Sequence, residues 1–366
     1  MPTLQSTKMR KPPRAPSTPS KVPRHIAVIG AGMAGIACAR TLVQAGHRVT
    51  VFDKNQDVGG RMATRDTPFG TFDPGTQYFT VRDARFAQAL ATTPGACKPW
   101  SANTVRVLDT YGRVTAAGLP AREPHWVPAP AMNTLPTQWA QPLHEAGSVE
   151  LQTRVTRIEP DPISARHWQL RTSGAEDSQH VFSGFDAVVL ATPSAQAQEL
   201  LQNSRQGSRL AKQISAVRVA PCWTLMLAFP QAVQPTLTHL GPQWNAARST
   251  HHRIAWLARE SSKPGRGAIE RWTVQASDAW SHEHLEDDAP RVQAKLLKAF
   301  AEVTGIRTEP GHAEVHRWRY AQTLKPLGKT HVWDAKARLG LCGDYLIGHR
   351  VEDAFVSGLE LALSMA

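Results

Sequence analysis

The 366-residue chain has little cysteine, and its four cysteines lie far apart in the sequence. Cys38, Cys97, Cys222 and Cys342 form no C-x-x-C pair, so the sequence predicts neither a disulfide framework nor a cysteine-based zinc site. There are 15 histidines but no H-E-x-x-H motif, and we expect no bound metal. Isolated, reduced thiols favour the cytoplasm as the location of the protein.

Long apolar runs are also missing. The longest nearly uncharged stretch, 26–39, is too short and too rich in glycine to span a bilayer. The N-terminus lacks the continuous apolar core of a secretory signal. The composition therefore indicates a soluble globular protein, long enough for two domains, with no membrane partner.

Acidic residues are absent from residues 1–24, which carry six lysines and arginines and six prolines. We expect this tail to be disordered, because it has almost nothing to bury. Its prolines oppose the amphipathic helix of a targeting peptide. The tail supplies half of the net charge of +12, so the rest of the chain has only a mild basic excess and no nucleic acid partner is expected.

The most informative stretch lies between His25 and Asp53. It predicts a short strand, a G-x-G-x-x-G turn, a helix and a second strand that ends on an acid. Gly30 permits the sharp turn, Gly32 lets the backbone approach a pyrophosphate, and Gly35 lets the helix pack on the strand. The helix N-terminus favours phosphate, and Asp53 suits the hydroxyls of an adenosine ribose. The chain is expected to bind an adenine dinucleotide, and the carboxylate argues against a 2′-phosphate.

Similar elements return later in the chain. A buried strand is expected at 185–193, and a strand at 339–344 is followed by an amphipathic helix at 350–365. Between about 200 and 320 the sequence changes to strand-like runs that contain tryptophan. All 11 tryptophans follow position 99, and they either line a substrate cavity or fill the core.

These patterns predict an α/β fold with a discontinuous, Rossmann-like FAD-binding domain and a second, mixed antiparallel-sheet substrate domain. FAD fits this arrangement because it stretches across the sheet and its ring needs a second set of contacts. The expected divisions are a tail at 1–24, an FAD-binding domain at 25–95, 149–200 and 335–366, and a substrate domain at 96–148 and 201–334.

Five segments carry a resemblance to a known family: GAGMAGIACARTL, VFDKNQDVGGRMATR, FDPGTQYFTVRDARF, HRWRYA and CGDYLIGHRVEDAFVSG. Together they resemble the renalase group of FAD-dependent oxidoreductases, especially its bacterial members, within the amine-oxidase-like flavoproteins. The resemblance runs from about residue 25 to the C-terminus.

The resemblance implies a non-covalent FAD. Arg61 would neutralise phosphate charge, Val155 would cover the adenine, and Asp344 would bind near the ribityl chain or pyrophosphate. Val351 and Glu352 open the last helix, whose dipole would face the flavin pyrimidine. The residues expected at the cofactor are Gly30, Ala31, Gly32, Met33, Ala34, Gly35, Asp53, Lys54, Gly60, Arg61, Met62, Gln77, Tyr78, Val155, Ala191, Thr192, Gly343, Asp344, Val351 and Glu352.

The chain also departs from the relatives' pattern. Pro74 stands where many of them have histidine, and no lysine matches the one that amine oxidases place beside the flavin. No catalytic acid or base is indicated. The residues expected to line the substrate pocket are Trp256, His316, Arg319 and Tyr320.

The resemblance implies an oxidase that takes a hydride from the 2- and 6-dihydro isomers of NAD(P) and passes electrons to O2, giving hydrogen peroxide. One alternative is a flavin oxidoreductase acting on an amine or an apolar alkene. Another is a non-catalytic, redox-sensing flavoprotein that docks through its basic tail. The oligomeric state and the preference for NAD or NADP isomers stay open.

Overall fold

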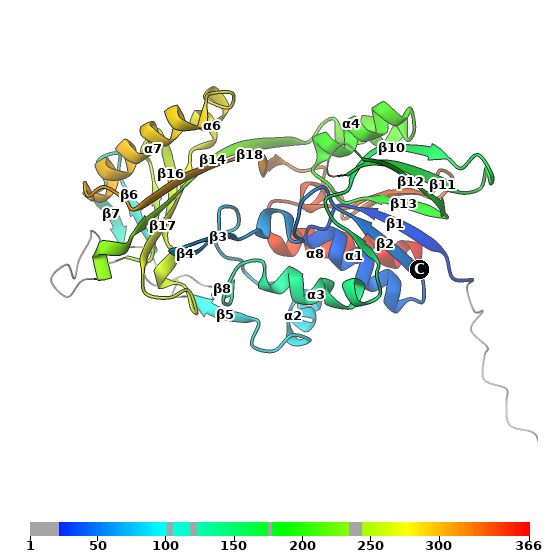
Figure 1. The fold of residues 1–366 in the computed structure, drawn as a ribbon, viewed down its shortest axis with the longest axis horizontal. Coiled ribbons are helices and arrows are strands. Elements are labelled where there is room, and N and C mark those ends of the chain that lie inside the picture. Colours follow the sequence, from blue (N-terminus) through cyan, green and yellow to red (C-terminus); the bar gives the residue numbers. More distant parts are fainter. Residues whose placement is uncertain (1–21, 101–104, 118–122, 175–177, 234–243) are drawn as a thin grey trace, which may run out of the picture.

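The computed structural model describes residues 22–100, 105–117, 123–174, 178–233 and 244–366. Residues 1–21, and with them most of the expected disordered tail, lie outside this description. Two lobes lie side by side, and two long strands run from one to the other (Figure 1). These strands are β14 (Arg218–Phe229) and β18 (His312–Lys325), which pair antiparallel.

The first lobe, which we call the nucleotide lobe, is built on a six-stranded sheet of order β19-β20-β13-β1-β2-β9. Every neighbouring pair is parallel except β19 with β20. The strands are β1 (His25–Ile29), β2 (Arg48–Phe52), β9 (Val149–Glu150), β13 (Ala187–Leu190), β19 (Val332–Asp334) and β20 (Leu339–Leu341). Strands from both ends of the chain thus lie in one sheet, as the sequence predicts.

Helices cover the faces of this sheet (Figure 1). α1 (Met33–Gln44) and α8 (Val351–Met365) pack so closely that a Cβ at Gly358 would collide with the carbonyl oxygen of Ala34. α3 (Thr134–Glu145) packs against α1. α2 (Ala84–Ala91) contacts α8.

The alternating polar and apolar residues of 149–159 predict one continuous strand, but the chain breaks after β9. Gln152 adopts a left-handed conformation (φ 50°), which turns the chain out of the six-stranded sheet. It continues in a separate antiparallel sheet of β10 (Arg154–Pro160), β11 (Trp168–Ser173) and β12 (Gln179–Phe185). α4 (Ser194–Ser204) packs on β10 and on α5 (Ser208–Ile214).

The second lobe has a seven-stranded sheet of order β18-β14-β17-β16-β15-β6-β7. Its pairs are antiparallel except β15 with β6. The remaining strands are β6 (Val105–Leu108), β7 (Val114–Ala117), β15 (Ala246–Ser249), β16 (Ile254–Arg259) and β17 (Glu270–Ala276). α6 (Asp278–Glu283) and α7 (Ala289–Thr304) cover its outer face, where Leu225, Trp272 and Phe300 are buried together. The inner face is turned toward the nucleotide lobe (Figure 1).

Short elements fill the space between the lobes. They are the single turn η1 (Gly60–Met62), the hairpin β3 (Arg65–Thr67) and β4 (Gly70–Phe72), the pair β5 (Cys97–Trp100) and β8 (His125–Pro128), and the turns η5 (Glu260–Ser262) and η6 (Asp344–Leu346); η4 (Pro230–Val233) follows β14.

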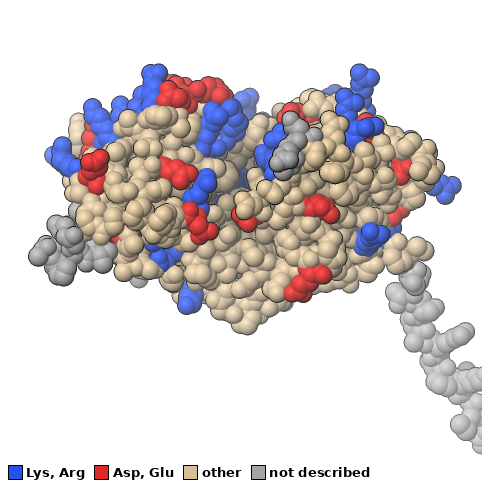
Figure 2. Space-filling view, viewed as in Figure 1, with Lys and Arg blue, Asp and Glu red and all other residues tan. Residues whose placement is uncertain are grey.

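The expected fold class is confirmed. Three elements that the sequence assigns to the second domain, α3, α5 and β19, lie in the nucleotide lobe instead, and the domain limits themselves stay a prediction. Within the described ranges, no helix combines the length and apolarity needed to cross a bilayer. The same ranges hold no cluster of three potential metal ligands. The visible face carries lysine and arginine interspersed with acids and no continuous basic stripe (Figure 2).

Candidate functional site

The glycine turn after β1 has the geometry that its sequence predicts. Gly30 has φ 110°, and a Cβ there would come 2.8 Å from the carbonyl oxygen of Ala191. A Cβ on Gly35 would collide with the carbonyl of Gly30, whereas a Cβ on Gly32 would meet nothing within 4 Å. The space in front of Gly32 is therefore open at the N-terminus of α1, where backbone N–H groups favour an anion.

A second glycine loop lies against the first. Gly59 donates its backbone N–H to the carbonyl of Ala31 (2.8 Å), and a Cβ on Gly60 would come 3.3 Å from the Cα of Gly32. The hydroxyl of Thr192, beside Gly30, is buried and has no hydrogen-bond partner among the described residues. Since a buried hydroxyl is costly when unpaired, this cradle suits a ligand with polar oxygens.

Asp53 ends β2 and is held by the backbone around it. Its Oδ2 accepts from the N–H of Ala31 (2.7 Å) and its Oδ1 from that of Asn55 (2.8 Å). Burial raises the pKa of this carboxyl above its ordinary value. A cavity of about 450 Å³ begins next to it, lined by Lys54, Asn55, Gln152, Arg154, Ser173 and Gly174. Val155 is buried in β10, next to Arg154.

Arg61 is paired with an acid in the structure, and its expected contact with phosphate stays a prediction. Its guanidinium is not a free cation, because Nη1 and Nη2 donate to the two carboxylate oxygens of Asp344 (3.0 and 2.5 Å). Arg61 also donates to the carbonyl of Ala321 (3.1 Å), and Asp344 accepts from the hydroxyl of Thr323 (3.0 Å). Bidentate pairing of this kind fixes both side chains, so the glycine loop, β18 and η6 meet at one point.

The segment Asp73–Tyr78 lies against the inner face of the seven-stranded sheet. The carbonyl of Pro74 accepts from the hydroxyl of Thr224 (2.9 Å) and from the indole of Trp318 (3.0 Å). The carbonyl of Gly75 accepts from the amide of Gln275 (2.6 Å). Three side chains of the second lobe therefore hold the segment Asp73–Tyr78, which follows the nucleotide lobe's glycine loops and β4 in the chain.

A fully buried cluster of charged residues also holds the segment Asp73–Tyr78 in place. The sequence analysis did not predict this cluster. Lys263 Nζ donates to Asp73 Oδ2 (2.9 Å), to Gln77 Oε1 (3.2 Å) and to Glu260 (3.0 Å). Arg266 donates to the same oxygen of Asp73 (2.7 Å). The side chains of the four charged residues are 0% exposed.

Burial and pairing act differently on the two acids of this cluster. Burial alone would raise the pKa of Asp73, but Lys263 and Arg266 hold it below its ordinary value. Burial raises the pKa of Glu260 despite the same lysine, because Asp73 adds repulsion. Of the four charged residues, only Asp73 lies in a segment that carries the family resemblance. Lys263 follows the short turn η5, and no sequence motif marks it.

Aromatic rings surround Tyr78, which is only half-buried. The ring of His125 stacks on it at 3.8 Å between centroids, and those of Trp256 and Trp100 lie at 5.7 and 6.4 Å. The indole N–H of Trp256 and Nδ1 of His125 are buried without a partner in the described part of the chain. We call Tyr78, Trp100, His125 and Trp256 the aromatic wall.

The segment His316–Tyr320 is divided between the two faces of β18. His316 packs on Trp318 (4.4 Å between ring centroids), which contacts the inner Pro74. Arg319 points the other way: it pairs with Glu286 (2.5 Å) and is exposed. Because side chains alternate along a strand, the expectation that Arg319 lines the inner pocket is wrong. Tyr320 is half-buried.

The last helix is tied to the site by an acid. Glu352 is buried, and its carboxylate accepts from the backbone N–H groups of Arg82 and Asp83 (2.5 and 2.8 Å). Glu352 therefore holds the start of α2 against α8, next to the half-buried Val351. The other expected cofactor residues lie at the glycine turn (Ala31, Met33, Ala34), in η1 (Met62), after β13 (Ala191) and before η6 (Gly343).

Two family profiles match the chain. One, described as an NAD(P)-binding Rossmann-like domain, matches residues 28–92, and the other, described as flavin containing amine oxidoreductase, matches residues 118–364. The second covers more than half of the chain.

Curated relatives match shorter parts. A 4,4'-diapophytoene desaturase of Staphylococcus haemolyticus is 48% identical over 58 residues, which is 16% of this chain and 12% of the relative. The flavin-containing monooxygenase FMO GS-OX-like 6 of Arabidopsis thaliana is 30% identical over 190 residues, 50% of this chain and 36% of the relative. The chain thus matches only a minor part of the length of these relatives.

Solved structures share the fold at low identity. A putative protoporphyrinogen oxidase from Exiguobacterium sp. 255-15 aligns with a TM-score of 0.69 at 13% identity, over 93% of this chain and 98% of that one. A putrescine oxidase bound to putrescine aligns with a TM-score of 0.69 at 12% identity, over 94% of this chain and 99% of that one. A cyclohexylamine oxidase from Brevibacterium oxydans IH-35A aligns with a TM-score of 0.68 at 12% identity, over 94% and 99%.

The residues present fit an FAD. The open space at Gly32, the unpartnered hydroxyl of Thr192 and the cavity beside Asp53 follow one another along the ends of the parallel strands, where such folds bind dinucleotides. The expected FAD-dependent oxidoreductase with a non-covalent flavin is confirmed, and the chain belongs to the flavin-containing amine oxidoreductase family.

Proposed function

We propose that this protein is a renalase-like oxidase of the cytoplasm. Its substrate would be a 2- or 6-dihydro isomer of NAD(P), which loses a hydride and becomes NAD(P)⁺. The hydride and one proton from solvent reduce O2 to hydrogen peroxide, so that electrons and protons balance. FAD, when bound, accepts the hydride and returns the two electrons to oxygen.

The aromatic wall is the observation that carries this proposal. The rings of His125 and Trp256 lie next to Tyr78, at the end of the segment Asp73–Tyr78. A planar dihydropyridine gains stacking contacts against such rings, and a fixed stacking distance orients the carbon that gives up the hydride. The buried, unpartnered N–H of Trp256 would donate to an oxygen of the substrate, such as its carboxamide.

A cation for the substrate's phosphates is available at the same place. Arg248 in β15 stands directly opposite Trp256 in β16, so the two side chains share one face of the sheet. Arg248 is exposed, and it lies near enough to His125 to lower the pKa of that imidazole, after burial itself. We therefore assign Arg248 to the pyrophosphate of the substrate. It had no motif in the sequence.

The two histidines near the proposed substrate site, His125 and His316, suit hydride transfer rather than proton abstraction. Burial lowers the pKa of His125 and of His316, which favours the neutral form of both imidazoles. A dihydropyridine is already a strong hydride donor, so the protein needs to orient it and exclude water rather than to deprotonate it. The four free cysteines agree with a reducing compartment.

Two other reactions are weighed against this proposal. The desaturase relative would favour the apolar alkene as substrate. Its identity with this chain is confined to 58 residues, however, and supports no conclusion about the substrate-binding residues. The putrescine and cyclohexylamine oxidases share the fold alone. A non-catalytic redox sensor would bind FAD equally well and turn over no substrate.

The test is anaerobic mixing of the FAD-loaded protein with 6-dihydroNAD, followed at the flavin absorbance. We expect rapid bleaching, recovery in air and one peroxide per substrate. Trp256→Leu should slow the bleaching about tenfold by removing the stacking contact, while the matched control Trp280→Leu, in α6 on the outer face of the seven-stranded sheet, should not. Bleaching by putrescine or cyclohexylamine but not by the isomers would make the enzyme an amine oxidase. Bleaching by none of them would leave the redox-sensor function.

A further inference from the structure

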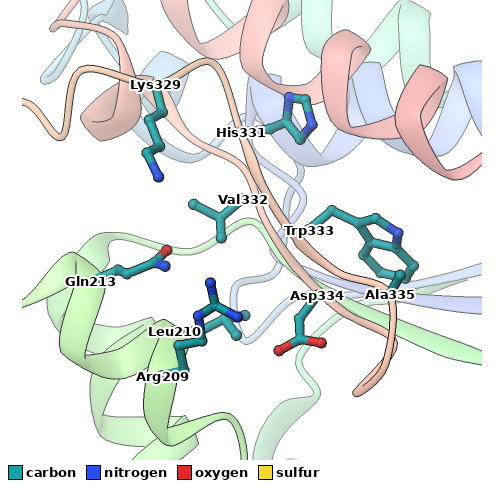
Figure 3. Close-up of a pocket in the computed structure, with 9 residues that line it drawn as sticks. All are labelled: Arg209, Leu210, Gln213, Lys329, His331, Val332, Trp333, Asp334 and Ala335. Atoms are coloured by element: carbon teal, nitrogen blue, oxygen red, sulfur yellow. The ribbon is translucent and has the colours of Figure 1, made fainter.

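A second cavity lies at the edge of the nucleotide lobe and shares no residue with the site described above. Its volume is about 370 Å³, and it opens between α5 and the edge strand β19 (Figure 3). The residues that line it are Arg209, Leu210, Gln213, Lys329, His331, Val332, Trp333, Asp334 and Ala335. It is large enough for a small organic ligand.

Two cations face one another across this cavity. The amino group of Lys329 and the guanidinium of Arg209 point toward the space in front of Val332 from opposite sides (Figure 3). In the described part of the chain, neither has an acidic partner among the ion pairs. The lining also holds one acid, Asp334, whose Oδ1 accepts from the backbone N–H groups of Lys336 and Ala337 (3.1 and 2.9 Å). The two cations outnumber this acid, so the cavity keeps a positive excess.

An unsatisfied amide lies between the two cations. Gln213 Oε1 is buried and accepts no hydrogen bond from any described residue. A buried acceptor left in this state costs free energy, and a hydroxyl or N–H of a ligand would remove that cost. The Gln213 side chain stands beside Val332 in Figure 3.

The floor of the cavity is apolar. Leu210 is 1% exposed and belongs to the same buried cluster as Leu339, and Val332 packs against that cluster. The cavity therefore combines a positive rim, one amide and a hydrophobic surface. This combination suits an anion that carries an organic part rather than a bare ion.

We propose that this cavity binds a small organic phosphate, with its phosphate between Arg209 and Lys329 and its organic part on Leu210 and Val332. A phosphate monoester carries about two negative charges near neutral pH. Its oxygens can accept from both Arg209 and Lys329, and its charge attracts the two cations more strongly than a singly charged carboxylate does. A hydroxyl of the ligand would donate to Gln213. This binding is independent of the oxidase reaction proposed above.

The experiment is calorimetric titration of the full, FAD-saturated protein with AMP, adenosine and inorganic phosphate. Saturation with FAD keeps the adenine end of the dinucleotide site closed to AMP. We expect AMP to bind more tightly than either other probe. Arg209→Gln and Lys329→Gln should each weaken AMP binding about tenfold, since each removes a charge-assisted hydrogen bond.

Two further variants sharpen the test. Gln213→Glu keeps the side-chain size but adds a negative charge, and we expect it to abolish AMP binding. Lys212→Gln removes a charge from the same helix outside the cavity lining, and we expect no change. The proposal is overturned if AMP does not bind, if adenosine or phosphate binds as tightly as AMP, or if Lys212→Gln weakens binding as much as Lys329→Gln.

Discussion

Lys263→Met offers the sharpest test of the buried ion cluster. Lys263 Nζ reaches Asp73, Gln77 and Glu260 at 2.9–3.2 Å, with its side chain 0% exposed. Methionine fills nearly the same volume but donates no hydrogen bond. Removing one partner of a buried ion pair costs about 3–5 kcal/mol, and we expect the free energy of unfolding to fall by that amount. Arg266 still pairs with Asp73 (2.7 Å), so the uncompensated charge falls on Glu260.

The loss should depend on pH, and its sign follows from Glu260. The pKa of Glu260 is already raised by burial, and removal of the lysine raises it further. A carboxyl with a raised folded-state pKa contributes stability below its unfolded pKa and loses it as the pH rises through the folded value. The defect of Lys263→Met should therefore be largest at high pH and shrink as the pH falls through the raised pKa of Glu260, where its carboxyl takes up a proton.

The measurement is urea unfolding of the FAD-saturated protein, followed by tryptophan fluorescence, at several pH values. Adding Glu260→Gln to Lys263→Met should recover about 1–2 kcal/mol, because no buried acid is then left without its cation. Lys298→Met, at an exposed position of α7, is the control and should change stability by less than about 0.5 kcal/mol. If Lys263→Met matched the wild type, or if the double variant were less stable than the single one, the reasoning would be refuted.

Two further predictions concern the cofactor and the substrate. Asp344→Asn breaks the bidentate pair with Arg61 (3.0 and 2.5 Å) and should weaken FAD binding at least about tenfold in a fluorescence titration, whereas Glu286→Gln, whose acid pairs only with outer arginines, should not; equal losses would remove the special role of Asp344. Arg248→Gln should raise KM for a dihydronicotinamide dinucleotide about tenfold at constant kcat and leave a phosphate-free dihydropyridine unaffected, and Arg319→Gln should change neither value.

The parts of the fold that the sequence predicted well are those encoded within a few residues of one another. The turn at Gly30–Gly35 and the acid at Asp53 follow a local pattern of strand, turn and helix, and their geometry depends on backbone space that only glycine leaves free. The strand at 187–190 and the helix at 351–365 were likewise legible from continuous or periodic apolar residues.

Contacts between residues that are far apart in the chain could not be predicted from such local patterns. Arg61 and Asp344 are 283 positions apart, and Lys263 and Asp73 are 190 apart. No local pattern indicates that Arg61 pairs with Asp344 or that Lys263 pairs with Asp73, because only the packing of the lobes brings these residues together. The carboxylate partner of Arg61 could not be foreseen for this reason, and the contact of Arg61 with phosphate stays a prediction.

One error could have been avoided from the sequence. His316, Arg317, Trp318 and Arg319 alternate ring and cation, which in a strand places the rings on one face and the arginines on the other. The structure has this division, with Arg317 and Arg319 both paired to Glu286. The tryptophans divide as well: Trp139 and Trp272 fill the core, whereas Trp256 and Trp318 are only partly buried and contact the segment between the lobes.

β18 links the residues expected at the cofactor to the segment Asp73–Tyr78, beside which we propose that the substrate binds. Within six residues it contacts the Pro74 carbonyl through Trp318, Arg61 through the carbonyl of Ala321, and Asp344 through Thr323. A one-residue slip of this strand would move every side chain to the other face, so all three contacts would be lost together. The pairing of β18 with β14 along His312–Lys325 fixes the register despite two irregularities, at Arg218–Val219 and at Ala220–Cys222. β18 lies in the same sheet as β16, which carries Trp256 of the aromatic wall. Backbone hydrogen bonds of this sheet therefore fix where the Arg61–Asp344 pair lies relative to Trp256. The site is thus pre-organised before the cofactor or the substrate binds.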